Sequence, residues 1–97
     1  MKALQLFQQL QTYLQNGGDI NYQDNVGWTA LMAASWQGYL EIVKLLVEKG
    51  AKLDIENDYG STSLRIAYEN GYLYIVKYLK QKTIECYQSK INEVNKY

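Results

Sequence analysis

The 97-residue chain contains no histidine and no proline, only one cysteine, and no net charge, because ten basic side chains balance ten acidic ones. Without histidine it lacks the commonest general base and the commonest transition-metal ligand. The one cysteine, Cys86, has no partner for an internal disulfide and no histidine to activate its thiol. A neutral chain also lacks the bulk attraction that drives non-specific nucleic-acid binding. We therefore expect no catalysis, no cofactor, no metal site and no nucleic-acid partner.

Long apolar segments are also missing. No run approaches the ~18 residues that a membrane-spanning helix requires, and Gln5, Gln8 and Gln11 interrupt the apolar pattern that a secretory signal would need. The length suits one small domain, and a hydrophobic fraction of 47% is ordinary for a globular protein. We expect a single cytoplasmic domain that does not bind membranes.

The sequence repeats itself at an interval of 33 residues. Residues 24–34 align with residues 57–67, and residues 38–44 align with residues 71–77. The identities fall on Gly, Thr, Leu, Ala and β-branched positions. Residues of these types set turns, helix starts and close packing, so the repeat indicates a repeated structural unit.

Each repeat predicts two short helices and a turn-rich loop. Thr29 and Thr62 stand where N-caps are expected, at the start of a first helix of about eight residues. Gly38 and Gly71 should end that helix, because glycine adopts a positive φ without steric cost. The pattern therefore sets both boundaries of the first helix in each repeat.

The second helix of the first full repeat is expected over residues 40–49, where apolar residues form one stripe. The stripe consists of Leu40, Val43, Leu46 and Val47. Gly50 should end this helix, and residues 51–60 contain too much Asp, Asn and Gly to be helical. A helix pair of this size cannot bury its apolar face alone, so the repeats must stack on each other.

This pattern resembles the ankyrin repeat. In that family an acidic residue, a glycine and a threonine precede the first helix, and a Glu-Ile-Val-Lys second helix leads to Gly-Ala. The matching residues are Asp24, Gly27, Thr29, Leu31, Ala34, Gly38, Glu41, Ile42, Val43, Lys44, Leu45, Leu46, Gly50 and Ala51. The resemblance covers roughly residues 7–82 and implies an all-α solenoid of stacked helix pairs with short hairpin loops.

Two departures from the family pattern affect the contacts between repeats. The family's proline is replaced by Ala30 and Ser63, and its histidine by Met32 and Arg65. That histidine usually links adjacent repeats by hydrogen bonds. The links must therefore be replaced by others in this chain, or be absent.

We predict one ankyrin-repeat domain over residues 1–97. Residues 1–23 would form an N-terminal cap helix and the first hairpin, residues 24–56 a full repeat, and residues 57–82 a second, looser repeat. Residues 83–97 would extend the last helix as a C-terminal cap, because apolar residues continue there at intervals of three and four. We expect this extension to cover the open end of the stack.

The resemblance also implies a function and a binding face. Ankyrin repeats usually bind proteins through their concave face, which the hairpin tips and the exposed side of each first helix form. The chain would then be a non-catalytic adaptor or inhibitor. The positions that correspond to the concave face are Gln23, Asn25, Val26, Trp28, Trp36, Gln37, Glu56, Asp58, Tyr59, Ser61, Glu69 and Asn70.

Large side chains at four of these positions favour a binding face. Surface positions of a solenoid are usually polar, yet Val26, Trp28, Trp36 and Tyr59 occupy them, and Trp and Tyr dominate interface hot spots. Two alternatives remain open. The tryptophans could fold back onto the hairpins to support a thin core, or the same face could join two copies in a homodimer.

The charge is unevenly distributed along the neutral chain. Residues 19–69 contain eight acids and four bases, whereas residues 70–97 contain two acids and five bases. An acidic, aromatic face would suit a partner protein with a basic patch. Aspartate is also favoured in turns for its local hydrogen bonds, which would explain Asp19, Asp24 and Asp54. We expect a monomer or a weak homodimer that binds an unidentified protein.

Overall fold

The computed structural model describes residues 2–96 of the chain, and the side chains of residues 4–96. Met1 and Tyr97, which the predicted boundaries include, lie outside the described residues. The described residues form five helices and no strand, which confirms the all-α fold. The helices are α1 (Lys2–Gln15), α2 (Ala30–Gln37), α3 (Leu40–Glu48), α4 (Ser63–Glu69) and α5 (Leu73–Val94).

The first helix of each repeat begins as the sequence predicts, and α2 also ends as predicted, whereas α4 ends at Glu69 with Asn70 and not Gly71 as its C-cap. The hydroxyl of Thr29 accepts a hydrogen bond from the backbone N–H of Met32 at 3.2 Å, and Thr62 caps α4 in the same way. Gly38 ends α2 with a φ of 78°. Any other residue at this position would have a positive φ and a Cβ 2.7 Å from the ring of Tyr72, so a side chain here would strain the backbone and displace that ring.

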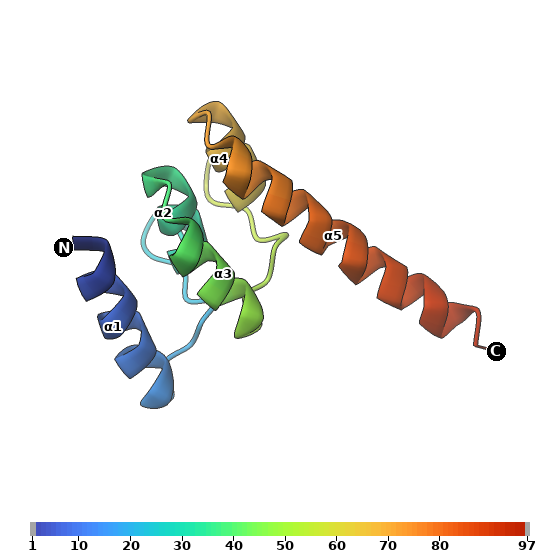
Figure 1. The fold of residues 1–97 in the computed structure, drawn as a ribbon, viewed down its shortest axis with the longest axis horizontal. Helices are drawn as coiled ribbons and strands as arrows, with labels where there is room; N and C mark the ends of the chain where they lie inside the picture. Colours follow the sequence, from blue (N-terminus) through green and yellow to red (C-terminus); the bar gives the residue numbers. More distant parts are fainter. Residues whose placement is uncertain (1, 97) are drawn as a thin grey trace.

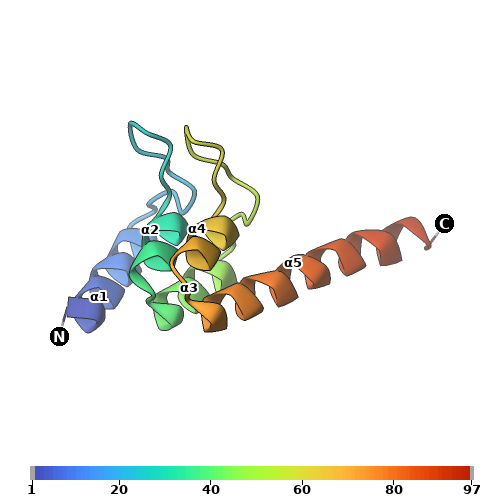
Figure 2. The ribbon, with the colours of Figure 1, turned by 90° about the horizontal axis from the view of Figure 1, so that it is seen from above.

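The core lies between stacked helix pairs. Figure 1 shows α1, α3 and α5 in order across the molecule, and α2 and α4 lie side by side as the inner helices in Figure 2. The buried apolar residues are Leu31, Met32, Ala34, Ile42, Val43, Leu45, Leu46, Ala51, Ile66, Ala67, Ile75, Val76 and Leu79. Most of them come from α2, α3 and α5, so the first full repeat and the start of α5 carry most of the core.

The apolar stripe predicted for the second helix is only partly correct. Val43 and Leu46 are fully buried, but Ile42 and Leu45 are buried as well, and the predicted Leu40 and Val47 are half-buried. The helix lies between α1 and α5, so a wider face is covered than one stripe provides. It ends at Glu48, one residue earlier than expected.

Two hairpin loops leave the helices in the same direction and lie side by side (Figure 2). The first spans residues 16–29 and the second residues 49–62. A backbone hydrogen bond of 3.0 Å from the N–H of Asp58 to the carbonyl of Val26 joins them. Gly27 makes this close approach possible, since a Cβ there would lie 3.0 Å from the Cα of Asn57.

The last helix extends beyond residue 82 as predicted, but it does not cover the end of the stack. Its first turns bury Ile75, Val76 and Leu79, whereas every described residue from Ile84 onward is exposed. Figures 1 and 2 show this part projecting away from the other helices. The physical reason is length: α5 has 22 residues, α3 has 9 and α4 has 7, so no neighbouring helix reaches its second half.

Candidate functional site

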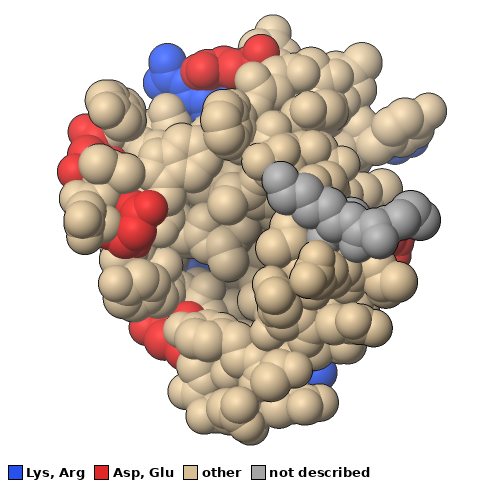
Figure 3. Space-filling model, turned by 90° about the vertical axis from the view of Figure 1, so that its left-hand side faces the viewer, with Lys and Arg blue, Asp and Glu red and all other residues tan. Residues whose placement is uncertain are grey.

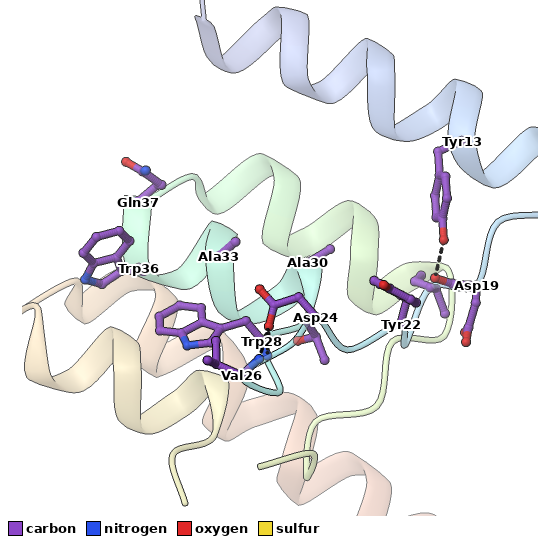
Figure 4. A pocket seen from close by; sticks show the side chains of 12 residues that line it. Tyr13, Asp19, Tyr22, Asp24, Val26, Trp28, Ala30, Ala33, Trp36 and Gln37 are labelled. Atoms are coloured by element: carbon purple, nitrogen blue, oxygen red, sulfur yellow. Dashed lines mark hydrogen bonds between the residues drawn. The ribbon is translucent and has the colours of Figure 1, made fainter. Parts of the chain in front are cut away.

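A groove lies between the first hairpin, the inner helix α2 and the end of α1. Its volume is about 830 Å³, and Figure 3 shows it as a hollow in one side of the molecule. It is lined by Tyr13, Asp19, Ile20, Tyr22, Asp24, Val26, Trp28, Thr29, Ala30, Ala33, Trp36 and Gln37 (Figure 4).

A smaller pocket of about 270 Å³ adjoins this groove and shares both tryptophans with it. Its lining is Trp28, Trp36, Asn57, Tyr59, Ser61, Ile66, Glu69 and Asn70. We call the two together the aromatic groove. Of the twelve residues predicted for the concave face, eight line it: Val26, Trp28, Trp36, Gln37, Tyr59, Ser61, Glu69 and Asn70. Gln23, Asn25, Glu56 and Asp58 lie on the hairpins outside this lining.

The two tryptophans form an edge-to-face pair at the centre of the groove. Their ring centroids are 5.9 Å apart and their planes meet at 70°, a favourable geometry for aromatic rings. Trp28 comes from the loop before α2 and is half-buried, whereas Trp36 lies near the end of α2 and is 54% exposed. The pair therefore supports the local structure and still presents one indole to solvent.

Two further apolar side chains extend this exposed surface onto the hairpins. Tyr59, near the tip of the second hairpin, is 78% exposed, and Val26 on the first hairpin is 42% exposed. With Trp36 they form an exposed set on two successive hairpins and one helix. The position of Tyr59 in the lining of the smaller pocket places it on the same side as the tryptophan pair.

The hairpins are shaped by one acceptor in each repeat. The carboxylate of Asp24 accepts hydrogen bonds from the backbone N–H groups of Val26 at 3.0 Å and Trp28 at 2.9 Å. Asn57, 33 residues later, accepts in the same way from Tyr59 at 2.9 Å and Ser61 at 3.0 Å. These bonds fix the backbone at Trp28 and Tyr59. The turn explanation of Asp24 is thus confirmed, and the equivalent Asn57 was not recognised from the sequence.

Side-chain hydrogen bonds join the first hairpin to the second. The side-chain amide of Gln23 donates to the carbonyls of Gly27 at 3.0 Å and Glu56 at 3.2 Å. Asn21 accepts from the backbone N–H of Lys52 at 2.9 Å. Gln23, expected as a partner contact, therefore already ties one hairpin to the next.

Two more predicted contact residues have partners within the fold. The side-chain amide of Asn70 donates to the backbone carbonyl of Trp36 at 3.2 Å, which links α4 to α2. Glu69 accepts a hydrogen bond from Arg65 at 2.7 Å across one turn of α4. Met32, which replaces the histidine, is fully buried. The bond of Asn70 is a contact between repeats, which the sequence pattern alone does not reveal.

The aromatic groove carries only negative formal charge along its lining. Asp19, Asp24 and Glu69 line it, and no lysine or arginine does so among the described residues. Figure 3 shows acidic side chains along the side of the molecule where the hairpins lie, beside a hollow with mostly uncharged walls. This arrangement provides an apolar floor with acidic groups at its edges.

A second groove, of about 610 Å³, lies on another side of the molecule between residues 50–54 and α5. There the ammonium of Lys82 and the carboxylate of Glu85 are 3.2 Å apart. Their hydrogen bond raises the pKa of Lys82 and lowers the pKa of Glu85. Cys86 is exposed beside them. Across residues 2–96 no three metal-ligating side chains cluster, and no helix is both long and apolar enough to cross a membrane.

Comparison with known protein families identifies one matching model. It is described as ankyrin repeats (3 copies), and it matches residues 1–90 of the chain. The matched range includes both hairpins, the aromatic groove and most of α5. Comparison with curated proteins finds no match.

Proposed function

The chain belongs to the ankyrin-repeat family, and from that premise we propose that it is an adaptor or inhibitor that binds a partner protein in the aromatic groove. Ankyrin repeats are in general protein–protein interaction modules and are typically non-catalytic. The observation that carries the proposal is the exposure of Trp36 and Tyr59 along one groove. Isolated exposed apolar residues are ordinary, but aromatic residues gathered in one groove favour an interface.

The energetics of such residues support this assignment. A Trp or Tyr side chain buries a large area while only two torsions become fixed, so it provides much of the binding energy of an interface. Trp36 would make the main contact, with Val26 and Tyr59 beside it. Trp28 would hold the Trp36 indole in place through the edge-to-face contact. Gln23 and Asn70 would shape the groove through their links between repeats.

Charge favours a partner with a basic patch. Glu69 in the lining is paired with Arg65, but Asp19 and Asp24 add negative charge to the lining, and Glu56 and Asp58 add it on the second hairpin. Opposite charges at the edge of an interface mainly accelerate association and select the partner. Replacing Asp58 with Lys should therefore slow association and weaken its salt dependence.

The test is capture of a partner on the immobilised chain, with matched variants. Trp36→Ala removes the most exposed tryptophan, and Tyr74→Ala removes an aromatic side chain that is 82% exposed on α5, away from the groove. A specific partner should bind the wild type and Tyr74→Ala, and should bind Trp36→Ala about thirty-fold more weakly. Equal binding to all three folded proteins would contradict the proposal. If the captured protein is a second copy of the chain and Trp36→Ala weakens its binding, the aromatic groove joins the two copies in a homodimer.

A further inference from the structure

The projecting part of α5, residues 84–94, carries an apolar stripe that no helix of the described residues covers. We call this segment the arm. Its four apolar residues are strongly exposed: Ile84 by 59%, Tyr87 by 62%, Ile91 by 51% and Val94 by 74%. Within the chain, the ammonium of Lys90 lies 5.8 Å from the centre of the Tyr87 ring. A helix that meets only water does not need such residues, and the rest of the arm is polar. The stripe therefore indicates a surface that another molecule covers.

The stripe has the geometry of a helix-pairing seam. The four residues follow one another at intervals of three, four and three. At about 100° per residue they fall within an arc of roughly 80° on one side of the helix. This alternation is the spacing at which two helices interlock their side chains along a common line. Ser89 lies on the side of the arm opposite the stripe, where it lines the second groove.

We propose that the arm pairs in antiparallel orientation with the arm of a second copy of this chain. Under a two-fold axis near residue 89, Ile84 faces Val94 of the second copy, and Tyr87 faces Ile91. The stripe is thus complementary to itself, as a symmetric dimer interface requires. The bodies of the two copies lie at opposite ends of the pair, because each arm projects from its own helix stack (Figure 1).

Charge selects the antiparallel orientation over the parallel one. Continuing the same spacing toward the start of α5 places Lys80 and Lys77 on the line of the stripe. Parallel helices would bring both lysines against their copies, and buried like charges are unfavourable. Antiparallel pairing across residues 84–94 leaves both lysines outside the contact. Among the lysines, antiparallel pairing brings only Lys90 near the same residue of the second copy, at the solvent-exposed edge of the pair.

The area of the stripe suits a weak dimer. The exposed parts of four side chains of this size, taken on two copies, amount to on the order of 1,000 Å², at the lower end for specific interfaces. We therefore expect a dissociation constant above about 1 µM. The arm is separate from the aromatic groove, so this inference does not depend on the proposed function.

Sedimentation equilibrium of the full chain tests the proposal. The concentrations should run from about 10 µM to about 1 mM, which covers the dissociation constants of weak, transient interfaces. The wild type should shift from monomer to dimer as its concentration rises. Ile91→Glu, which places a charge in the stripe, should weaken the dimer at least about tenfold. Ser89→Glu, on the opposite side of the arm, is the matched control and should dimerise like the wild type. Thermal melting should show that all three bodies remain folded.

Two further measurements address the orientation of the arms and the contact between them. Lys90→Gln should strengthen the dimer and reduce its response to salt, because it removes the like charges that antiparallel pairing brings together. A spin label on Cys86, the only cysteine, should report an inter-copy distance with Cα atoms within about 20 Å, from helix rise and helix spacing. A dimer that Lys90→Gln does not strengthen would overturn the antiparallel orientation, and a longer distance would overturn the contact between the arms.

The proposal as a whole fails on either of two results. The first is a wild type that stays monomeric at about 1 mM, a concentration above the dissociation constant expected for an interface of this size. The second is a dimer that Ile91→Glu leaves unchanged. If Trp36→Ala disrupts that dimer instead, the aromatic groove and not the arm joins the two copies.

Discussion

Ser35 has a fully buried hydroxyl group, and this hydroxyl has no hydrogen-bond partner among the described residues. Burying such a group without a partner costs more than burying a methyl group of similar size. Ser35→Ala should therefore raise the free energy of unfolding by about 1 kcal/mol, measured by urea denaturation. A matched helix-cap variant, Thr29→Ala, should lower it by about 1 kcal/mol, because it removes the bond to Met32. A loss of stability in Ser35→Ala would mean that the hydroxyl has a partner after all.

The two tryptophans should differ in their contribution to stability. Both substitutions lose the edge-to-face contact, but Trp28 is more buried than Trp36. Trp28→Ala therefore removes more packed area. We expect a loss of about 2 kcal/mol for Trp28→Ala and about 1 kcal/mol for Trp36→Ala in denaturant melts. Equal losses would show that the burial of Trp28 adds nothing to stability. The milder effect makes Trp36→Ala the better variant for binding experiments.

At the scale of single residues, the sequence predicted positions better than roles. Thr29 and Gly38 were assigned correctly because caps and positive φ depend on local backbone geometry. Gln23 and Asn70 were assigned to the binding face from their positions, but the bonds that they make within the fold were not predicted. Their bonds to Glu56 and Trp36 span 33 and 34 residues. Such bonds depend on the spacing between stacked repeats, which no local pattern contains.

At the scale of elements, α5 divides into a packed first half and a free second half. Removing residues 84–97 should change the free energy of unfolding of the body by less than about 1 kcal/mol, because the described part of this segment is exposed. Leu79→Ala, in the packed half, should cost about 2–5 kcal/mol. Thermal melts of both variants and the wild type check this difference. A truncated protein that melts far below the wild type would show that the arm packs on the body in solution.

The ion pair between Lys82 and Glu85 gives the start of the arm a dependence on pH. The pKa of Glu85 is lowered in the folded protein, so its stabilising effect is present above the ordinary pKa of a glutamate and is lost as the pH falls through the lowered value. The pair is exposed, so the effect should be confined to the arm. Carbon chemical shifts should show helicity around Glu85 decreasing in acid while α2 is unchanged. Glu85→Gln, the matched control, should lack this transition.

The length of α5 and its burial were not equally predictable. Apolar residues at helical spacing beyond Thr83 predicted that the helix continues, and it does. The same residues suggested that the helix covers the stack, which is wrong because Ile84 and Ile91 lie beyond the reach of α3 and α4. Periodicity reports which residues share a side of a helix. It does not report whether a neighbouring element is long enough to meet that side.

At the scale of the whole molecule, the 33-residue interval was the most informative feature of the sequence. It predicted that the helix pairs and the hairpins recur at the same positions of each repeat, including those that form the aromatic groove, because both repeats share the same residues at turns and helix starts. The interval could not supply the contacts that make two units one body. Those contacts are the hydrogen bonds between the hairpins and the packing of α2 on α4. One of the hydrogen bonds comes from the side chain of Gln23, at a position that Glu56 occupies in the second repeat.

Helices that are adjacent in the sequence pack against each other, and this arrangement affects the rate of folding. Proteins whose contacts are local in sequence fold quickly, because little loop entropy is lost before the first contacts form. The chain has no proline, so its unfolded state has no X–Pro bonds that isomerise over tens of seconds. Stopped-flow refolding should therefore finish within about a second, with no slower phase. Molecules that unfold would then regain the aromatic groove almost at once.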